Sequence, residues 1–373
     1  MGINRKEIVE PLLAWYQKHA RVLPWRQDPS PYHVWLSEIM LQQTRVEEVK
    51  EYYKRFLDAL PTVQDLAAAE EDQLLKLWQG LGYYNRARNL QRAAREICTE
   101  YEGNFPMEYE QWLDLPGVGE YTAGAVVSMA FGRKKPAVDG NVYRIYTRLQ
   151  ADGTDITKAE FRRRVREEIE GIMPENPGQF NQAWMDLGAM VCLPNGTPLC
   201  GQCPLSAFCR SHQEGTELSY PVKPAKKPRR IEERTVFLLE YQGKYLIQKR
   251  PDKGLLAGLW EFPAQEGHLS PEQVSMGLQD LGVVCVDDSE GIVLLGKAKH
   301  VFSHVEWHMI GYAVHLSAIT DQLRDTGIFS TSKELRDTYS IPSAFSFYLD
   351  YLMGAMASPD VAKENIEKNT LQE

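Results

Sequence analysis

The sequence has no long apolar run and no excess of basic charge. Its apolar runs fall short of the about 20 residues that a membrane-spanning helix needs, and residues 1–7 hold no apolar stretch of the signal-peptide kind. The formal net charge of −9 argues against a surface coated in basic residues. Because local patches and helix N-termini bind phosphate whatever the net charge, a DNA partner is not excluded. We expect a cytoplasmic protein without a membrane partner.

Cysteine is scarce and unevenly placed. The chain has six cysteines, and four of them lie between Cys192 and Cys209. A disulfide framework would spread cysteines through a small secreted chain, so the clustering indicates a metal site instead. The four residues Cys192, Cys200, Cys203 and Cys209 have the spacing C-x7-C-x2-C-x5-C. Four thiolates this close suit either a zinc ion or a [4Fe–4S] cluster, and the spacing alone leaves both open.

The length of the chain and the change in its residue pattern along the sequence predict two domains. At 373 residues it is longer than one ordinary domain, and 43% hydrophobic and 25% charged residues are typical of a globular protein. Residues 1–215 are expected to be helical, and residues 233–357 to form a mixed α+β domain. Between them, residues 216–232 are rich in proline and basic residues and predict a linker. Residues 358–373 are polar and are expected to be disordered.

Apolar periodicity predicts the elements of both halves. In the first half, apolar residues recur at helical spacing over 35–60, 74–78 and 90–97, and two more helices are expected between 115 and 149 around Lys134-Lys135-Pro136. In the second half, strands are expected at 235–240, 244–248, 292–295 and 310–316, with one helix over 271–281. Gln242-Gly243 predicts a tight hairpin turn between the first two strands.

A glycine-containing loop precedes one of the expected helices. Gly117, Val118 and Gly119 follow Pro116, and the two glycines allow a tight turn and a close approach to another chain. N–H groups at the start of the next helix are suited to bind phosphate, so this loop predicts contacts to a DNA backbone. About twenty residues further on, Asp139 lies at or before another helix start, where an N-cap role is the plain alternative to a functional one.

The hairpin, the aspartate and the cysteine cluster occur in the order seen in one superfamily. The first half resembles the endonuclease III-type helix-hairpin-helix glycosylases, and nearly the whole chain resembles the MutY-type adenine DNA glycosylase family. The resemblance implies a [4Fe–4S] cluster on the four cysteines. One departure is the spacing of seven residues between the first two cysteines, where the family usually has six; Asn195-Gly196 predicts a turn that absorbs the extra residue. The matching segments are 23–26, 35–44, 80–84, 115–123, 138–142 and 180–182.

The resemblance assigns the chemistry to two carboxylates. Glu38 is similar to the family's acid, which protonates adenine N7 before the base leaves, and Asp139 to the carboxylate that stabilises the sugar cation. Tyr121 stands where strand-cutting relatives have a lysine that forms a Schiff base, which implies a monofunctional glycosylase with Tyr121 and Asn141 supporting Asp139. From the residues alone, Glu38 shares a helical stripe with Gln42 and Arg45, and a surface salt bridge explains it equally well.

A duplex hides adenine, so the base must be flipped out. Trp25, Arg26 and Gln182 resemble the residues of the adenine pocket. Gln43 and Tyr83 resemble residues that fill or wedge the opened stack. As isolated residues, Trp25 and Tyr83 are more often core residues.

Within the second domain, residues 258–263 resemble the start of a Nudix hydrolase domain. The expected helix over 271–281 lacks the run of glutamates that binds magnesium in Nudix hydrolases, so nucleotide hydrolysis is not expected. Phe302, Ser303 and His304 resemble the family's loop that recognises 8-oxoguanine in the opposite strand. A polar β-turn is the simpler explanation of this segment when it is considered alone.

The sequence therefore predicts a multidomain protein, with an all-α helix-hairpin-helix glycosylase domain carrying an iron–sulfur cluster, followed by an α+β Nudix-like domain. We expect a monomer that binds double-stranded DNA and removes adenine opposite 8-oxoguanine or guanine. An endonuclease III-like enzyme, a catalytically inactive DNA-binding protein and a nucleotide hydrolase are the rival interpretations. Tyr121 and the second domain argue against the first, the paired Glu38 and Asp139 against the second, and the missing glutamates against the third.

Overall fold

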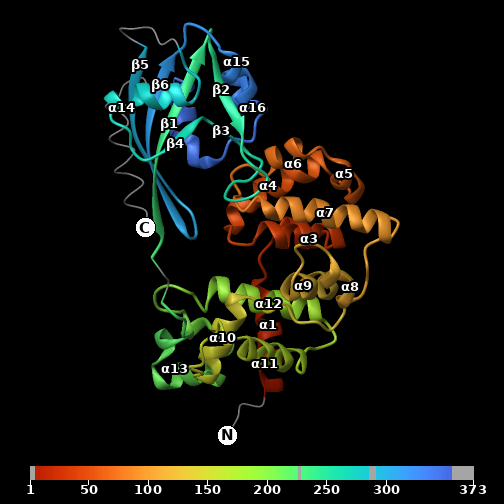
Figure 1. Ribbon diagram of the computed structural model, residues 1–373. Helices are drawn as coiled ribbons and strands as arrows, with labels where there is room; N and C mark the ends of the chain where they lie inside the picture. Colours follow the sequence, from red (N-terminus) through yellow and green to blue (C-terminus); the bar gives the residue numbers. More distant parts are fainter. Residues whose placement is uncertain (1–4, 226–227, 285–290, 355–373) are drawn as a thin grey trace. The chain divides into compact units, whose positions relative to one another are not determined.

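The computed structural model describes residues 5–225, 228–284 and 291–354. The chain divides into two compact units (Figure 1). The helical unit comprises Met1–Ala69 and Asn85–Lys226, and the sheet unit comprises Glu70–Tyr84 and Lys227–Glu373. The expected tail over 358–373 lies outside the described residues, as does Cys285. Within the described residues, no helix has the length and apolar character required to cross a membrane.

In its described residues the helical unit contains helices and no strands, in keeping with the predicted fold class. Its core packs α1, α10, α11 and α12 together around Phe180 and Trp184, with Cys192, Cys203 and Cys209 at its margin. The elements are η1 Arg5–Ile8, α1 Val9–His19, α2 Pro24–Gln27, α3 Pro31–Met40, α4 Val46–Ala59, α5 Val63–Ala68, α7 Asn85–Glu100, α8 Tyr109–Asp114, α9 Glu120–Phe131, α10 Gly140–Gln150, α11 Ala159–Glu170, α12 Pro177–Met190, η2 Cys200–Gln202, η3 Ser206–Phe208, α13 Arg210–Glu214 and η4 Glu217–Ser219.

The apolar run over 35–60 does not form one continuous helix. α3 ends at Met40 and α4 begins at Val46, and Gln43 between them has a positive φ of 59°. The guanidinium of Arg86 on α7 donates to the carbonyls of Ile39, Met40 and Gln42, which satisfies the free carbonyl groups at the end of α3. The predicted stripe that joined Glu38 to Gln42 and Arg45 is therefore wrong, because the helix ends before either residue.

The predicted helix-hairpin-helix is confirmed. α8 and α9 are joined by the loop that contains Gly117, Val118 and Gly119. Gly117 has a φ of +76°, and a Cβ there would lie 2.6 Å from the Cβ of Asn89, so both its conformation and its packing require glycine. Gly119 is the N-cap of α9 and provides no side-chain cap. The N–H of Val118 donates to the Leu115 carbonyl, so this group is already used within the loop.

The sheet unit contains a mixed seven-stranded sheet with strand order β3-β2-β1-β6-β5, in which β4 also pairs with β1 and β7 with β2. β1 and β6 are parallel, and the other pairs are antiparallel. The hairpin turn at Gln242-Gly243 is confirmed, because both residues have positive φ. The strands are β1 Arg230–Tyr241, β2 Lys244–Lys249, β3 Trp260–Glu261, β4 Ala264–Glu266, β5 Ile292–Val301, β6 Val305–His315 and β7 Ile328–Thr331.

Helices cover both faces of this sheet. Alternate residues of β1 face opposite sides, so Phe237 packs in the cluster that includes α14, and Val236 packs in the cluster that includes α16 and α17. The helix expected over 271–281 is confirmed as α14, but the short helices further along the chain were not predicted. The helices assigned to the sheet unit are α6 Glu71–Leu77, α14 Pro271–Asp280, α15 Asp321–Thr326, α16 Ser332–Asp337, η5 Ser343–Phe345 and α17 Ser346–Leu352.

Candidate active site and metal centre

Seven of the residues predicted for the active site line one cavity of the helical unit. The cavity has a volume of about 220 Å³. Glu38 is contributed by α3, Tyr121 by the first turn of α9, and Asp139 by the N-cap of α10. Gln43 and Tyr83 are not among the residues that line it. The predicted residues in its wall are Trp25, Arg26, Glu38, Tyr121, Asp139, Asn141 and Gln182.

Glu38 is a buried carboxyl group with one strong hydrogen-bond donor. Its side chain is only 4% exposed, and Tyr121 donates its hydroxyl to Oε2 over 2.5 Å. Burial raises the pKa of Glu38 to about 7, an increase that the Tyr121 hydrogen bond opposes and the charge of Asp139 reinforces. Burial and the adjacent carboxylate also raise the pKa of Tyr121 well above its usual value, so this phenol remains neutral and donates. A carboxyl group that changes charge near neutral pH is suited to proton transfer.

Asp139 caps a helix and faces the cavity at once. Its Oδ1 accepts the backbone N–H groups of Asn141 and Val142, each over 2.9 Å, and its Oδ2 accepts the Asn141 amide over 2.7 Å. Burial raises the pKa of Asp139 above its usual value, although these three donors favour the charged form. The N-cap interpretation and the functional one are thus compatible, since the cap leaves the carboxylate in the cavity wall.

A glycine on α12 allows this arrangement. A Cβ at Gly188 would lie 2.5 Å from the Cβ of Asn141, so any larger residue would displace Asn141. Arg144 then donates to Asn141 Oδ1 over 2.8 Å and to the carbonyls of Gly188 and Cys192. The Asp139–Asn141 pair is therefore held from both α10 and α12.

Beneath the cavity lies an ion network that the sequence did not reveal. Asp186 is fully buried, and its two oxygens accept both terminal nitrogens of Arg26 at 2.8 and 2.9 Å and the Nε of Arg21 at 2.7 Å. Burial alone would raise the pKa of Asp186, but the hydrogen bonds and charge of Arg26 outweigh it and lower the pKa. Asp186 fixes the guanidinium of Arg26 in the cavity wall, where its positive charge acts on Glu38.

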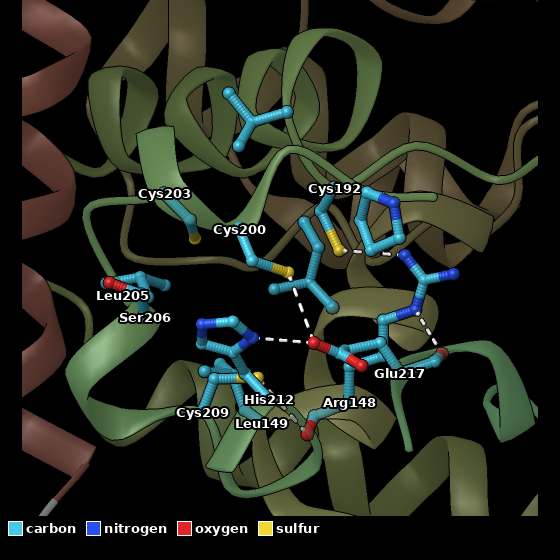
Figure 2. A pocket seen from close by; sticks show the side chains of 13 residues that line it. Arg148, Leu149, Cys192, Cys200, Cys203, Leu205, Ser206, Cys209, His212 and Glu217 are labelled. Carbon is cyan, nitrogen blue, oxygen red and sulfur yellow. Dashed lines mark hydrogen bonds and ion pairs between the residues drawn. The ribbon is translucent and has the colours of Figure 1, made fainter. Parts of the chain in front are cut away.

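The four clustered cysteines line a second pocket of the helical unit (Figure 2). All four sulfurs are free of disulfide bonds. Gly196 has a φ of 71°, and the Leu199 N–H donates to the Val191 carbonyl, so the extra residue after Cys192 is accommodated in a closed turn, in agreement with the prediction. Arg148 donates to the sulfur of Cys192 over 3.2 Å.

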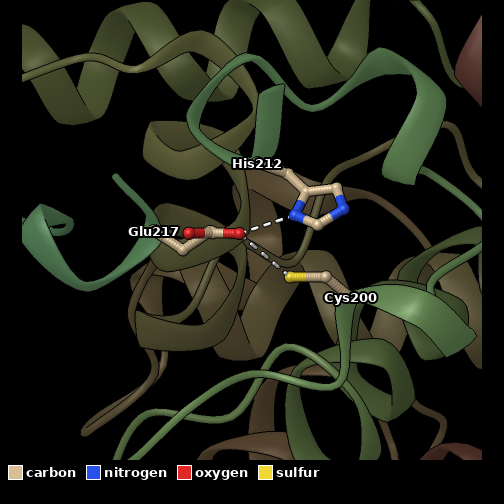
Figure 3. A group of neighbouring side chains, drawn as sticks. All are labelled: Cys200, His212 and Glu217. Carbon is tan, nitrogen blue, oxygen red and sulfur yellow. Dashed lines mark hydrogen bonds and ion pairs between the residues drawn. The ribbon is translucent and has the colours of Figure 1, made fainter. Parts of the chain in front are cut away.

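Two residues beside these cysteines were not anticipated. The carboxylate of Glu217 contacts the His212 ring nitrogen at 2.6 Å and the Cys200 sulfur at 3.6 Å (Figure 3). Among the described residues, these three form the group of potential metal ligands whose atoms lie within 4.8 Å of one another. In this described part of the chain, no three of the four cysteine sulfurs lie all within 4.8 Å of one another.

In the sheet unit, Phe302, Ser303 and His304 form the turn between β5 and β6, which the Phe302 N–H closes by donating to Val305. Ser303 and His304 are exposed. The Phe302 ring is only partly exposed, because it packs edge-on against His300 at 4.6 Å and Trp307 at 4.9 Å. The turn therefore presents two polar side chains, and Phe302 supports it from beneath.

Comparison with known proteins gives both units a family. Residues 36–170 match the HhH-GPD superfamily of base excision DNA repair proteins, and residues 235–351 match the NUDIX domain. The chain is 35% identical to the adenine DNA glycosylase of Rattus norvegicus, over 83% of this chain and 70% of the relative. It is 33% identical to that of Buchnera aphidicola subsp. Schizaphis graminum, over 87% of this chain and 93% of the relative.

Among solved structures, a thermostable thymine-DNA glycosylase is similar with a TM-score of 0.52 and 30% identity, covering 56% of this chain and 97% of that one. The likeness supports the glycosylase fold of the helical half. From the matches to curated relatives over most of its length, the chain belongs to the adenine DNA glycosylase family, within the HhH-GPD superfamily.

Proposed function

We propose that this protein is a monofunctional adenine DNA glycosylase that removes adenine opposite 8-oxoguanine or guanine in double-stranded DNA, acting as a monomer. The observation that carries the proposal is the cavity in which Glu38, with a pKa of about 7, lies with Asp139 and a neutral tyrosine. The relatives' shared name, adenine DNA glycosylase, supports the choice of base.

Each carboxyl group has its own role in breaking the bond. Protonated Glu38 donates to N7 of the flipped adenine, the N-glycosidic bond breaks, and its electron pair leaves with the protonated base. The sugar is left as an oxocarbenium ion, which the carboxylate of Asp139 stabilises by on the order of 4 kcal/mol at about 4 Å and an effective dielectric near 20. Water then adds to C1′ and gives its proton to Glu38, which restores the acid.

The absence of strand cutting follows from Tyr121. A bifunctional enzyme needs an amine that attacks C1′ and forms a Schiff base, and a phenol with its pKa raised well above 10 does not provide one. The other described side chains that line the cavity include no lysine. The expected product is an intact strand with an abasic site.

We further propose that Cys192, Cys200, Cys203 and Cys209 hold a [4Fe–4S] cluster that ties together the end of the helical unit. Four sulfurs on one zinc ion, each at about 2.3 Å from it, would lie about 3.8 Å apart. The wider spread of the four sulfurs in the described residues favours a larger centre. Purified protein should contain about four irons and no stoichiometric zinc, which elemental analysis and the visible spectrum test; one tightly bound zinc in colourless protein would exclude the cluster.

In the sheet unit, Ser303 and His304 are proposed to read the 8-oxoguanine opposite adenine. Replacing both by alanine should reduce the preference for 8-oxoguanine over guanine by about one to two powers of ten, with little change in the rate on A opposite G. If both rates fall together, the turn has only a structural role.

The function itself is tested by a glycosylase assay on duplexes with A opposite 8-oxoguanine, guanine and cytosine. The proposal predicts base release from the first two and no cleavage until alkali is added. Efficient trapping of a covalent enzyme–DNA adduct by borohydride, or no release of adenine from any duplex, would contradict it.

A further inference from the structure

A tyrosine outside the cavity makes a hydrogen bond to a residue in its wall. Tyr16 on α1 is 6% exposed, and its hydroxyl donates to Oε1 of Gln182 on α12. Gln182 lines the cavity, whereas Tyr16 does not. The contact therefore connects the buried face of helix α1 to the surface that a flipped base would meet.

The position of Tyr16 is itself fixed from below. The guanidinium of Arg26 lies 5.8 Å from the centre of the Tyr16 ring, and Asp186 holds Arg26 in place through two hydrogen bonds. Burial, partly offset by the charge of Arg26, raises the pKa of Tyr16 above its usual value. At neutral pH the ring therefore carries an intact O–H group.

This O–H group determines which way the amide of Gln182 faces. A buried hydroxyl hydrogen must find an acceptor, and among the described residues the acceptor that Tyr16 contacts is Oε1 of Gln182. The opposite orientation would place the amide NH₂ against the hydroxyl and leave the hydroxyl hydrogen without that acceptor. With Oε1 directed at Tyr16, the NH₂ group is the part of the amide available to the cavity.

We propose that Tyr16 is a positioning residue that fixes the polarity of Gln182, so that Gln182 donates a hydrogen bond to a ring nitrogen of the flipped adenine. This inference rests on the proposed function and specifies how the same site selects its base. Adenine carries lone pairs on N1 and N3, whereas guanine carries a hydrogen on N1. A base with a hydrogen at the facing position would bring two donors together, which disfavours its binding.

The test is a double-mutant cycle, in which a tyrosine of the enzyme and an atom of the base are changed singly and together. Duplexes carry, opposite 8-oxoguanine, the 2′-fluorinated nucleotide of adenine, 1-deazaadenine, 3-deazaadenine or purine. The fluorine disfavours the sugar cation, so the base stays attached and affinity is read without chemistry. Dissociation constants are measured for the wild type, for Tyr16→Phe and for Tyr32→Phe. Tyr32 is the matched control, since its buried hydroxyl bonds the Leu60 carbonyl at 2.9 Å and does not contact Gln182.

One of the two deaza substitutions should weaken binding to the wild type and to Tyr32→Phe by about tenfold, the change that corresponds to one hydrogen bond. The same substitution should weaken binding to Tyr16→Phe by less than twofold, because the amide is no longer held with its NH₂ toward the base. Removing the 6-amino group, as in purine, should affect all three proteins equally.

Equal losses in all three proteins for both deaza bases would overturn the proposal. The proposal would also be overturned if the loss of affinity on removing the 6-amino group were smaller in Tyr16→Phe than in the wild type. That result would mean that the amide oxygen of Gln182 faces the base. Failure of the proposed function is separable, since wild-type release of unfluorinated adenine is measured in parallel and does not enter the affinity cycle.

Discussion

The hydrogen bond from Tyr121 to Glu38 makes a quantitative prediction about pH. The bond favours the ionised form of Glu38 and so holds its pKa at about 7 against the effect of burial. A hydrogen bond to a charged group contributes about 1.5–3 kcal/mol. At 1.36 kcal/mol per pH unit, Tyr121→Phe should raise the pKa of Glu38 by about one to two.

The consequence is a displaced alkaline limb in the rate of base release. Glu38 must be protonated to act, so the wild-type rate should fall about tenfold per pH unit above pH 7 and be about one hundredth of its plateau at pH 9. In Tyr121→Phe the fall should begin at about pH 8 to 9, so the rate at pH 9 remains between about one tenth and one half of its own plateau. The plateau itself can be lower without affecting this comparison.

The measurement is single-turnover excision of adenine from a duplex with 8-oxoguanine between pH 5 and 10, which gives the plateau and the alkaline limb of each protein. Tyr32→Phe is the control, because it removes a buried hydroxyl bonded to a backbone carbonyl and should keep the wild-type alkaline limb. An alkaline limb in Tyr121→Phe that coincides with that of the wild type, or lies at lower pH, would refute the assignment of Glu38 as the titrating acid.

Three further predictions concern the groups around the cavity. Gly188→Ala should displace Asn141 from Asp139 and lower the single-turnover rate about 10- to 150-fold. Gly153→Ala is the control and should keep the wild-type rate, because a Cβ there meets nothing within 4 Å; equal rates in the two variants would contradict the prediction. Asp186→Ala leaves Arg26 and Arg21 without their buried partner and should lower the free energy of unfolding in urea by about 3–5 kcal/mol, so a loss below about 1 kcal/mol would be inconsistent with the network. The pKa of Glu38 is about 7 in the folded protein, above its ordinary value of 4.5. This group therefore contributes most to stability below pH 4.5, and its contribution is lost as the pH rises to about 7. Glu38→Gln should raise the unfolding free energy at pH 8 by up to about 3 kcal/mol and leave it lower or equal at pH 4.

Local sequence was sufficient where one segment determines one element. Gln242-Gly243 adopts the positive φ angles that its residues favour, and Gly117 and Gly119 form the turn that the hairpin needs. The break between α3 and α4 was not predictable in this way. No glycine or proline occurs over 41–45, and the apolar spacing continues across the break. The Arg86 side chain that binds the end of α3 comes from a helix that lies more than 40 residues further along the chain.

The candidate site was predictable only in part for the same reason. The resemblance assigned Glu38, Tyr121 and Asp139 to one site, and all three line the same cavity. Tyr121 was expected to support Asp139, whereas its hydroxyl donates to Glu38. Tyr16, Arg21 and Asp186 were missed because their partners lie about 160 residues away along the chain. A lone aspartate in an apolar helix such as α12 is the one sequence signal that would have indicated a buried ion pair. Likewise, α15, α16 and α17 have six or seven residues each, which is too short for a clear helical period.

Glu38 and Asp139 are proposed to act together in releasing adenine from DNA. The most direct measurement is the single-turnover release of free adenine from a duplex with A opposite 8-oxoguanine by the wild type, Glu38→Gln and Asp139→Asn, with duplex affinity measured for each protein. Only the wild type is expected to release adenine, and all three proteins are expected to bind the duplex with similar affinity, because binding relies mainly on phosphate contacts. Near-normal release by either variant would contradict it.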